Sequence, residues 1–134
     1  QIRSDFPGGW TGDAVDGFSG RGLSSIEKDI KEFTRKLLNW RKSKPVIHRG
    51  NLIQFAPENG VYTFFRYNDE ETIMVLFNKN DEMVEHKLSK YEEMLGDFTH
   101  AANIMGETTV RLDGKLNLSG KKAYIFSLSK DDKK

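Results

Sequence analysis

The spacing of hydrophobic positions changes at Pro45, from a helical period to an alternating one. Between Leu23 and Arg41, apolar residues recur every three or four positions, the pattern of an amphipathic helix. Its apolar stripe consists of Ile26, Ile30, Phe33, Leu37 and Trp40, widened by Leu38. Ser24 and Glu27 have the spacing of a capping box, and Pro45 ends the pattern. The sequence therefore predicts one long helix before Pro45.

Beyond Pro45, short runs rich in β-branched and aromatic residues alternate with turn sequences such as Asp113-Gly114. We expect strands at Val46–His48, Leu52–Phe55, Val61–Tyr67, Thr72–Phe77, Met83–Leu88, Ala102–Ile104, Thr108–Leu112, Leu116–Leu118 and Ala123–Leu128. A short helical turn is expected between Ser89 and Leu95. The runs VYTFFRY and TIMVLF are apolar on both faces, as expected of central strands between a second sheet and another covering layer. The predicted fold is mainly β, an antiparallel Greek-key sandwich preceded by a loop and one helix.

The stretch DFPGGWTGD, Asp5 to Asp13, predicts a tight loop near the start of the chain. Pro7 fixes its own φ, and the two glycines that follow allow positive φ. Such a loop normally follows a strand, and none precedes it here. The sandwich can also cover only part of the helical stripe. We therefore expect the chain to be cut from a larger protein, whose N-terminal body once packed against the loop and helix.

Composition narrows the class of protein. A chain of 134 residues with 37% hydrophobic content can bury a sizeable core as one domain. Its 21 basic and 20 acidic residues leave a net charge of +1, which argues against nucleic-acid binding. No apolar run approaches the ~18 residues of a membrane span, so no membrane partner is expected. The absence of cysteine excludes disulfides and leaves the compartment open.

Candidate chemistry in the sequence is sparse. His48, His86 and His100 lack the spacing of a metal site, and surface or strand positions explain them better. Nucleophile-elbow, phosphate-loop and Ser/His/Asp patterns are all missing. The loop carboxylates Asp5, Asp13 and Asp16 fit turn formation or loop bracing better than acid–base catalysis. We therefore predict no catalytic residue, no metal site and no cofactor in this chain.

The strands are rich in aromatic residues, namely Tyr62, Phe64, Phe65, Tyr67 and Phe77. Most of these must belong to the core of the sandwich. An exposed pair could instead form a platform on which sugar rings stack. This leaves open an alternative function, an autonomous carbohydrate-binding module, which requires a row of exposed, coplanar rings on one sheet or loop edge.

Three segments taken together resemble the C-terminal end of glycoside hydrolase family 13, the α-amylase family. These segments are RSDFPGGW, TRKLLNWRKSKPVIHRGNLIQFAPENGVYTFFRYN and TIMVLFNKND. The cyclomaltodextrinase and neopullulanase branch is the most similar, and the resemblance runs from Arg3 to about Asp81. It implies that residues 1–44 are a remnant of a (β/α)8 barrel, with the loop after strand eight and helix eight. Residues 45–130 would then be an α-amylase-type C-terminal β-domain, and residues 131–134 a charged tail.

By this resemblance, the parent enzyme hydrolyses α-1,4 or α-1,6 glucosidic bonds of maltodextrins, cyclodextrins or pullulan. Its catalytic carboxylates lie on barrel strands four, five and seven, which this chain lacks, so the fragment would be structural and would stabilise the barrel. Arg3, Asp5 and Trp10 would face the glucan cleft, although bracing of the loop explains them equally well. The resemblance favours a periplasmic or extracellular parent over a cytoplasmic one. The uncovered apolar surface also predicts self-association of the fragment.

Overall fold

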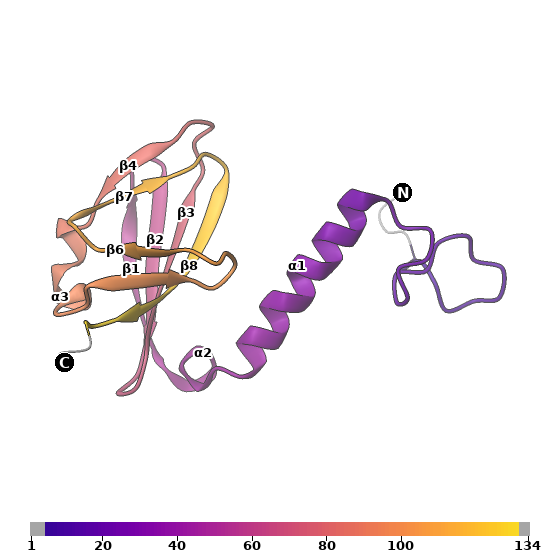
Figure 1. Cartoon of the computed structure of the whole chain (residues 1–134), viewed down its shortest axis with the longest axis horizontal. Coiled ribbons are helices and arrows are strands. Elements are labelled where there is room, and N and C mark those ends of the chain that lie inside the picture. Colours follow the sequence, from indigo (N-terminus) through magenta and orange to yellow (C-terminus); the bar gives the residue numbers. More distant parts are fainter. Residues whose placement is uncertain (1–4, 132–134) are drawn as a thin grey trace. The chain divides into compact units, whose positions relative to one another are not determined.

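The computed structural model describes residues 5–131, so Arg3 lies outside the described part of the chain. The chain divides into two compact units, residues 1–40 and residues 41–134. The first holds a loop and most of α1 (Ser25–Lys42), and the second holds the remaining helices and all the strands of the described residues (Figure 1).

Helix α1 begins where its capping box predicts. The backbone N–H of Ser24 donates to Glu27 Oε2 (2.8 Å), and the Glu27 N–H donates back to Ser24 Oγ (3.3 Å). These hydrogen bonds satisfy donors that the first helical turn leaves without intrahelical partners. At the other end, Arg41 and Lys42 place positive charge at the negative, C-terminal end of the helix dipole, where it is favourable. The sequence prediction of this helix is confirmed.

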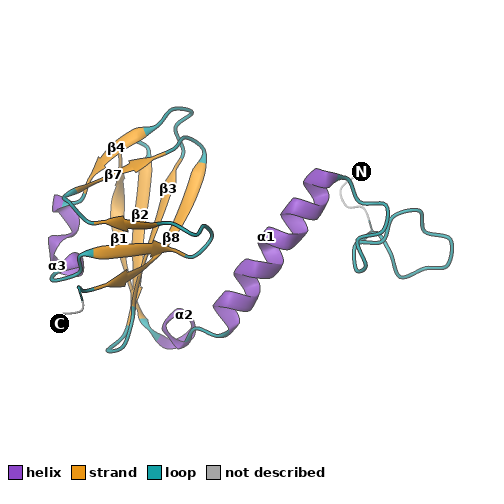
Figure 2. Ribbon diagram, viewed as in Figure 1, coloured by secondary structure: helices purple, strands orange, loops and turns teal. Residues whose placement is uncertain are grey.

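The second unit is built on antiparallel strands in two sheets (Figure 2). Its elements are α2 (Pro45–Arg49), β1 (Asn51–Glu58), β2 (Val61–Tyr67), β3 (Thr72–Asn78), β4 (Val84–Lys87), η1 (Ser89–Tyr91), α3 (Glu92–Leu95), β5 (His100–Asn103), β6 (Thr109–Arg111), β7 (Lys115–Leu118) and β8 (Lys122–Ser129). The larger sheet has the order β1-β2-β3-β8-β5-β6, and β4 pairs with β7 in the smaller one. The chain passes between the sheets after β3, β4, β6 and β7, which confirms the predicted sandwich.

Strand β3 lies in the middle of the larger sheet, between β2 and β8. Six of its seven residues are buried, as expected of a strand that is apolar on both faces. Its inward residues Met74 and Leu76 join Phe65 of β2 and Tyr91 of η1 in the core. The side-chain amide of Asn78, at the end of β3, donates to the backbone carbonyl of Leu118 at 3.0 Å. This hydrogen bond ties the two sheets together at one end of the core.

The prediction of a strand at Val46–His48 is wrong, because these residues form helix α2. Pro45 occupies the first turn of this helix, where its fixed φ is favourable and its missing N–H costs nothing. Val46 is buried, so the apolar pair that suggested a strand instead anchors a single helical turn. The other strand predictions agree with the structure to within two residues at their ends, except that β1 continues three residues beyond the predicted Phe55, to Glu58.

Candidate functional site

The loop before α1, residues 5–23, is organised around the carboxylate of Asp16. Its Oδ1 accepts hydrogen bonds from the backbone N–H groups of Phe18 (2.8 Å) and Ser19 (3.3 Å), and Oδ2 accepts one from Ser19 Oγ (2.7 Å). The Ser19 hydroxyl and these two backbone donors lower the pKa of Asp16 below its ordinary value. Asp16 therefore braces the loop, as its sequence context predicts.

Two glycines let the loop close tightly on itself. Gly8 has φ +104°, and a Cβ there would lie 2.5 Å from Asp16 Oδ1. At Gly17, a Cβ would lie 2.6 Å from the ring of Phe6, while the Gly17 N–H donates to the carbonyl of Pro7 at 2.8 Å. Larger residues at either position would push the two sides of the loop apart.

Trp10 belongs to this braced loop and is 79% exposed. Its backbone N–H donates to Asp13 Oδ2 (3.2 Å), and the Asp13 N–H donates to the Trp10 carbonyl (3.3 Å). These hydrogen bonds fix the backbone of Trp10, while its indole ring faces solvent. Asp5 is also exposed, so two of the three residues that sequence analysis proposed for substrate contact are accessible.

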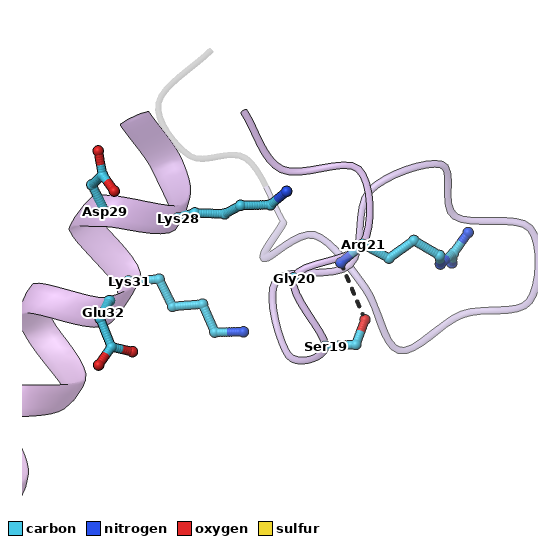
Figure 3. A pocket seen from close by; sticks show the side chains of 7 residues that line it. All are labelled: Ser19, Gly20, Arg21, Lys28, Asp29, Lys31 and Glu32. Carbon is cyan, nitrogen blue, oxygen red and sulfur yellow. Dashed lines mark hydrogen bonds between the residues drawn. The ribbon is translucent and has the colours of Figure 1, made fainter. Parts of the chain in front are cut away.

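Beside the loop, the first turns of α1 border a hollow of about 820 Å³ (Figure 3). Lys28 and Lys31 extend from the helix toward the loop, and the Lys31 ammonium donates to the carbonyl of Phe18 at 2.6 Å. Asp29 and Glu32 also line the hollow, but their carboxylates point away from the loop. Sequence analysis missed the contact between Lys31 and Phe18, because nothing in the local pattern signals it.

The three histidines occupy separate environments. His48 Nε2 lies 2.9 Å from the carbonyl oxygen of Arg41, and His100 Nδ1 lies 3.1 Å from Asp131 Oδ1. His86 is buried at 5% exposure, and its Nε2 lies 2.8 Å from the hydroxyl of Tyr91. Within residues 5–131, no three side chains of the metal-binding kinds gather closely enough to hold an ion. No helix in the same range is long and apolar enough to cross a membrane.

The apolar stripe of α1 is open in the structure, because none of the 18 residues of this helix is buried. Its large apolar side chains Ile26, Ile30, Phe33 and Leu38 are all more than half exposed. A stripe of this kind normally packs against another layer.

The aromatic residues of the β unit are partly in the core and partly at the surface, since Phe65 is fully buried while the side chain of Phe77 is 44% exposed.

Comparison with known proteins gives this arrangement a family context. The family model of the cyclo-malto-dextrinase C-terminal domain matches residues 52–127. An Anoxybacillus α-amylase superposes with a TM-score of 0.67 at 22% identity, over 92% of this chain and 26% of that one. The α-amylase of Geobacillus thermoleovorans, complexed with acarbose, gives 0.65 at 20% identity over 83% and 25%. AmyP in complex with maltose gives 0.68 at 16% identity over 83% and 22%. The chain thus spans about a quarter of the length of these amylases, with which it shares a fold.

Proposed function

Because the chain belongs to the family of cyclo-malto-dextrinase C-terminal domains, we propose that it is the C-terminal part of an α-glucan-degrading glycoside hydrolase. In this proposal, the longer enzyme hydrolyses α-1,4 or α-1,6 glucosidic bonds in maltodextrins, cyclodextrins or pullulan. The fold that the chain shares with α-amylases supports it. The part described here has a structural role: it packs against a catalytic barrel and stabilises it.

The exposed stripe of α1 is the observation that carries this role. Ile30, Phe33 and Leu38 are 60%, 52% and 55% exposed, so covering each of them would gain roughly half of the ~1.5–3 kcal/mol that full burial of such a side chain contributes. A barrel provides a cover of the right kind, because its outer helices each bury one apolar face against the strands. Residues 1–44 then correspond to the last loop and helix of the barrel, residues 45–130 to the C-terminal β-domain and residues 131–134 to a charged tail.

The loop fits a secondary role at the glucan cleft. Active sites of such barrels lie at the C-terminal ends of the strands, where the loop that precedes the last helix also lies. The exposed ring of Trp10 could stack on a sugar face, and Asp5 could accept hydrogen bonds from sugar hydroxyls. The bracing by Asp16 would hold Trp10 ready for this contact. Arg3, the third candidate, lies outside the described residues.

The hydrolytic chemistry belongs to the rest of the longer enzyme. A retaining glycosidase needs two carboxyl groups about 5 Å apart on either side of the scissile bond. In the α-amylase family, these groups come from barrel strands that are not among the elements of this chain. The chain therefore contributes stability and loop geometry, and its own carboxylates take no part in bond cleavage.

The test compares two lysine substitutions in the 134-residue chain and in the longer enzyme. Leu38→Lys places a charge on the apolar stripe, and Asn39→Lys places the same charge on a neighbouring exposed residue. We expect Leu38→Lys to destabilise the longer enzyme by a few kcal/mol, because the barrel would bury the charge. In the isolated chain it should leave the melting temperature unchanged and reduce self-association in size-exclusion chromatography.

Asn39→Lys should change neither protein measurably, which controls for the added charge. The proposed packing of α1 would be wrong if Leu38→Lys left the longer enzyme as stable as Asn39→Lys does. It would also be wrong if the isolated chain were strictly monomeric and Leu38→Lys unfolded it, because the stripe would then be covered within this chain.

A further inference from the structure

The turn between β1 and β2 consists of Asn59 and Gly60, the one place in the sequence where glycine follows asparagine. Their φ angles are 49° and 76°, as in the two-residue hairpin turns that Asn-Gly favours. Asn59 is exposed, and its side-chain amide has no hydrogen-bond partner among residues 5–131. The backbone N–H of Gly60 likewise donates to no residue in that range. The amide and the neighbouring N–H are therefore both available for reaction.

These two groups are the reactants of asparagine deamidation. The Gly60 nitrogen attacks Cγ of Asn59, so that an N–Cγ bond forms, the Cγ–Nδ2 bond breaks and the Gly60 proton leaves with the amide nitrogen as ammonia. Water then opens the cyclic imide at one of its two carbonyl groups, which gives aspartate or isoaspartate. Glycine hinders the attack less than any other successor, because no side chain stands beside its nitrogen.

The fold itself requires glycine at position 60. A Cβ there would collide with the side-chain amide of Asn80, in the turn after β3. That amide lies against the β1–β2 turn because its Nδ2 donates to the backbone carbonyl of Asn59 at 2.8 Å. Asn78 holds it there, since the Asn78 Oδ1 accepts from both the backbone N–H (3.0 Å) and Nδ2 (2.8 Å) of Asn80. Packing between the two turns thus fixes the reactive Asn-Gly pair.

The same hydrogen bond from Asn80 restrains the reaction. Ring closure turns the peptide between Asn59 and Gly60 toward the Asn59 side chain, and this rotation moves the Asn59 carbonyl. The bond between that carbonyl and Asn80 Nδ2 must therefore break before the imide can form. The folded chain should for this reason react more slowly than an unfolded one with the same sequence.

Other positions with related chemistry are less suited to it. Asn68 precedes a residue with a side chain, and its Oδ1 already accepts two backbone N–H groups, at 3.0 and 2.7 Å. Aspartate precedes glycine at Asp16 and Asp113, but the first carboxylate accepts three hydrogen bonds and the second pairs with Arg111 at 3.0 Å. An ionised carboxylate in such contacts is a poor electrophile. Asn59 is therefore the strongest candidate in the described part of the chain.

We propose that Asn59 is a modification site, where deamidation through a cyclic imide converts the turn to aspartate or isoaspartate at a rate that the side chain of Asn80 restrains. Isoaspartate adds a methylene group to the backbone, so the two-residue turn loses the geometry that matches the twist of its strands. Modification therefore loosens this end of the sandwich. The inference goes beyond the proposed function and does not depend on it.

The experiment incubates the 134-residue chain at pH 8 and 37 °C and follows the mass of each asparagine-containing peptide. Asn51 and Asn117 are internal controls, because both are exposed but precede leucine. We expect Asn59 to react at least about tenfold faster than either, which corresponds to a barrier lower by about 1.4 kcal/mol. Equal rates at the three positions would show that Asn59 is not the site.

Asn80→Asp tests the restraint, because it keeps the size of the side chain and removes the Nδ2 donor. It should raise the rate at Asn59 severalfold in the folded chain, whereas Asn117→Ala, the matched control, should not. In urea, where the hydrogen bond is lost, Asn80→Asp and the unchanged chain should react equally fast. If circular dichroism shows Asn80→Asp to be unfolded, Asn80→Ser takes its place. A folded variant that reacts no faster than the unchanged chain would overturn the role of Asn80.

The consequence for stability has its own control. The modified chain carries one more negative charge and can be isolated by ion exchange. We expect it to melt several degrees below Asn59→Asp, which has the same charge and an ordinary backbone. Equal melting temperatures would show that the turn tolerates isoaspartate, and the predicted loosening of the sandwich would then be wrong.

Discussion

Removing the buried hydroxyl of Tyr91 should measurably lower the free energy of unfolding of the β-sandwich. Tyr91 is 1% exposed, and its hydroxyl lies between His86 of the smaller sheet and Thr63 of the larger one. It donates to Thr63 Oγ1 at 3.0 Å and lies 2.8 Å from His86 Nε2. Because Thr63 and His86 are themselves buried, these three side chains form a buried polar network that links the two sheets.

Tyr91→Phe removes that oxygen and leaves two buried polar groups, Thr63 Oγ1 and His86 Nε2, without the hydroxyl they contact. An unsatisfied buried donor or acceptor costs about 1–3 kcal/mol. The ring itself stays, together with its packing against Phe55 at a centroid distance of 4.7 Å, so no large cavity forms. We therefore expect a loss of about 2–4 kcal/mol in the free energy of unfolding.

The assay is urea unfolding of the 134-residue chain at pH 8, where His86 is neutral, followed by fluorescence and far-UV circular dichroism. Tyr62→Phe is the matched control, because it removes a tyrosine hydroxyl that bonds only the exposed Gln54. This control should cost less than about 1 kcal/mol. Equal losses of unfolding free energy for Tyr91→Phe and Tyr62→Phe would refute the reasoning, because burial of the Thr63–Tyr91–His86 network would then add nothing to the cost of removing a hydroxyl.

Two further outcomes follow from the same structure. Burial is the main cause that lowers the pKa of His86; Glu58 opposes this with a smaller effect, and Lys90 lowers the pKa further. As the pH falls, the unfolded chain therefore binds a proton at this histidine before the folded chain does. The free energy of unfolding should then decrease as the pH falls below about 6.5 toward the pKa of the folded state. His86→Gln should flatten this loss between pH 7 and 5, and an unchanged slope in urea titrations would contradict the assignment. The isolated chain should also show no turnover of starch, pullulan or cyclodextrins and should bind maltoheptaose no tighter than about 1 mM. Activity in homogeneous protein, or micromolar affinity by calorimetry, would instead favour a free-standing enzyme or a carbohydrate-binding module.

The candidate site was only partly readable from the sequence. The Gly-rich loop and the bracing carboxylate Asp16 were predictable, because turn residues act through their own neighbours in the chain. The exposure of Trp10 was not, since it depends on how the whole loop closes. The same holds for the contact between Lys31 and Phe18, which joins residues from a helix and a loop. Residue type gave no sign that the Lys31 ammonium would reach the backbone carbonyl of Phe18.

The sequence by itself determined the elements whose signals are local. The capping box of Ser24 and Glu27 and the 3.6-residue period define α1, and alternation defines strands such as β2 and β3, because a strand or helix repeats its own geometry along the chain. Only the tertiary structure decided what each face touches. It buried Val46 in helix α2, placed Phe65 in the core but Phe77 at the surface, and brought Thr63 of β2 to the hydroxyl of Tyr91, which also contacts His86. Burial and contact are properties of packing between elements, and periodicity along one element does not specify its partner.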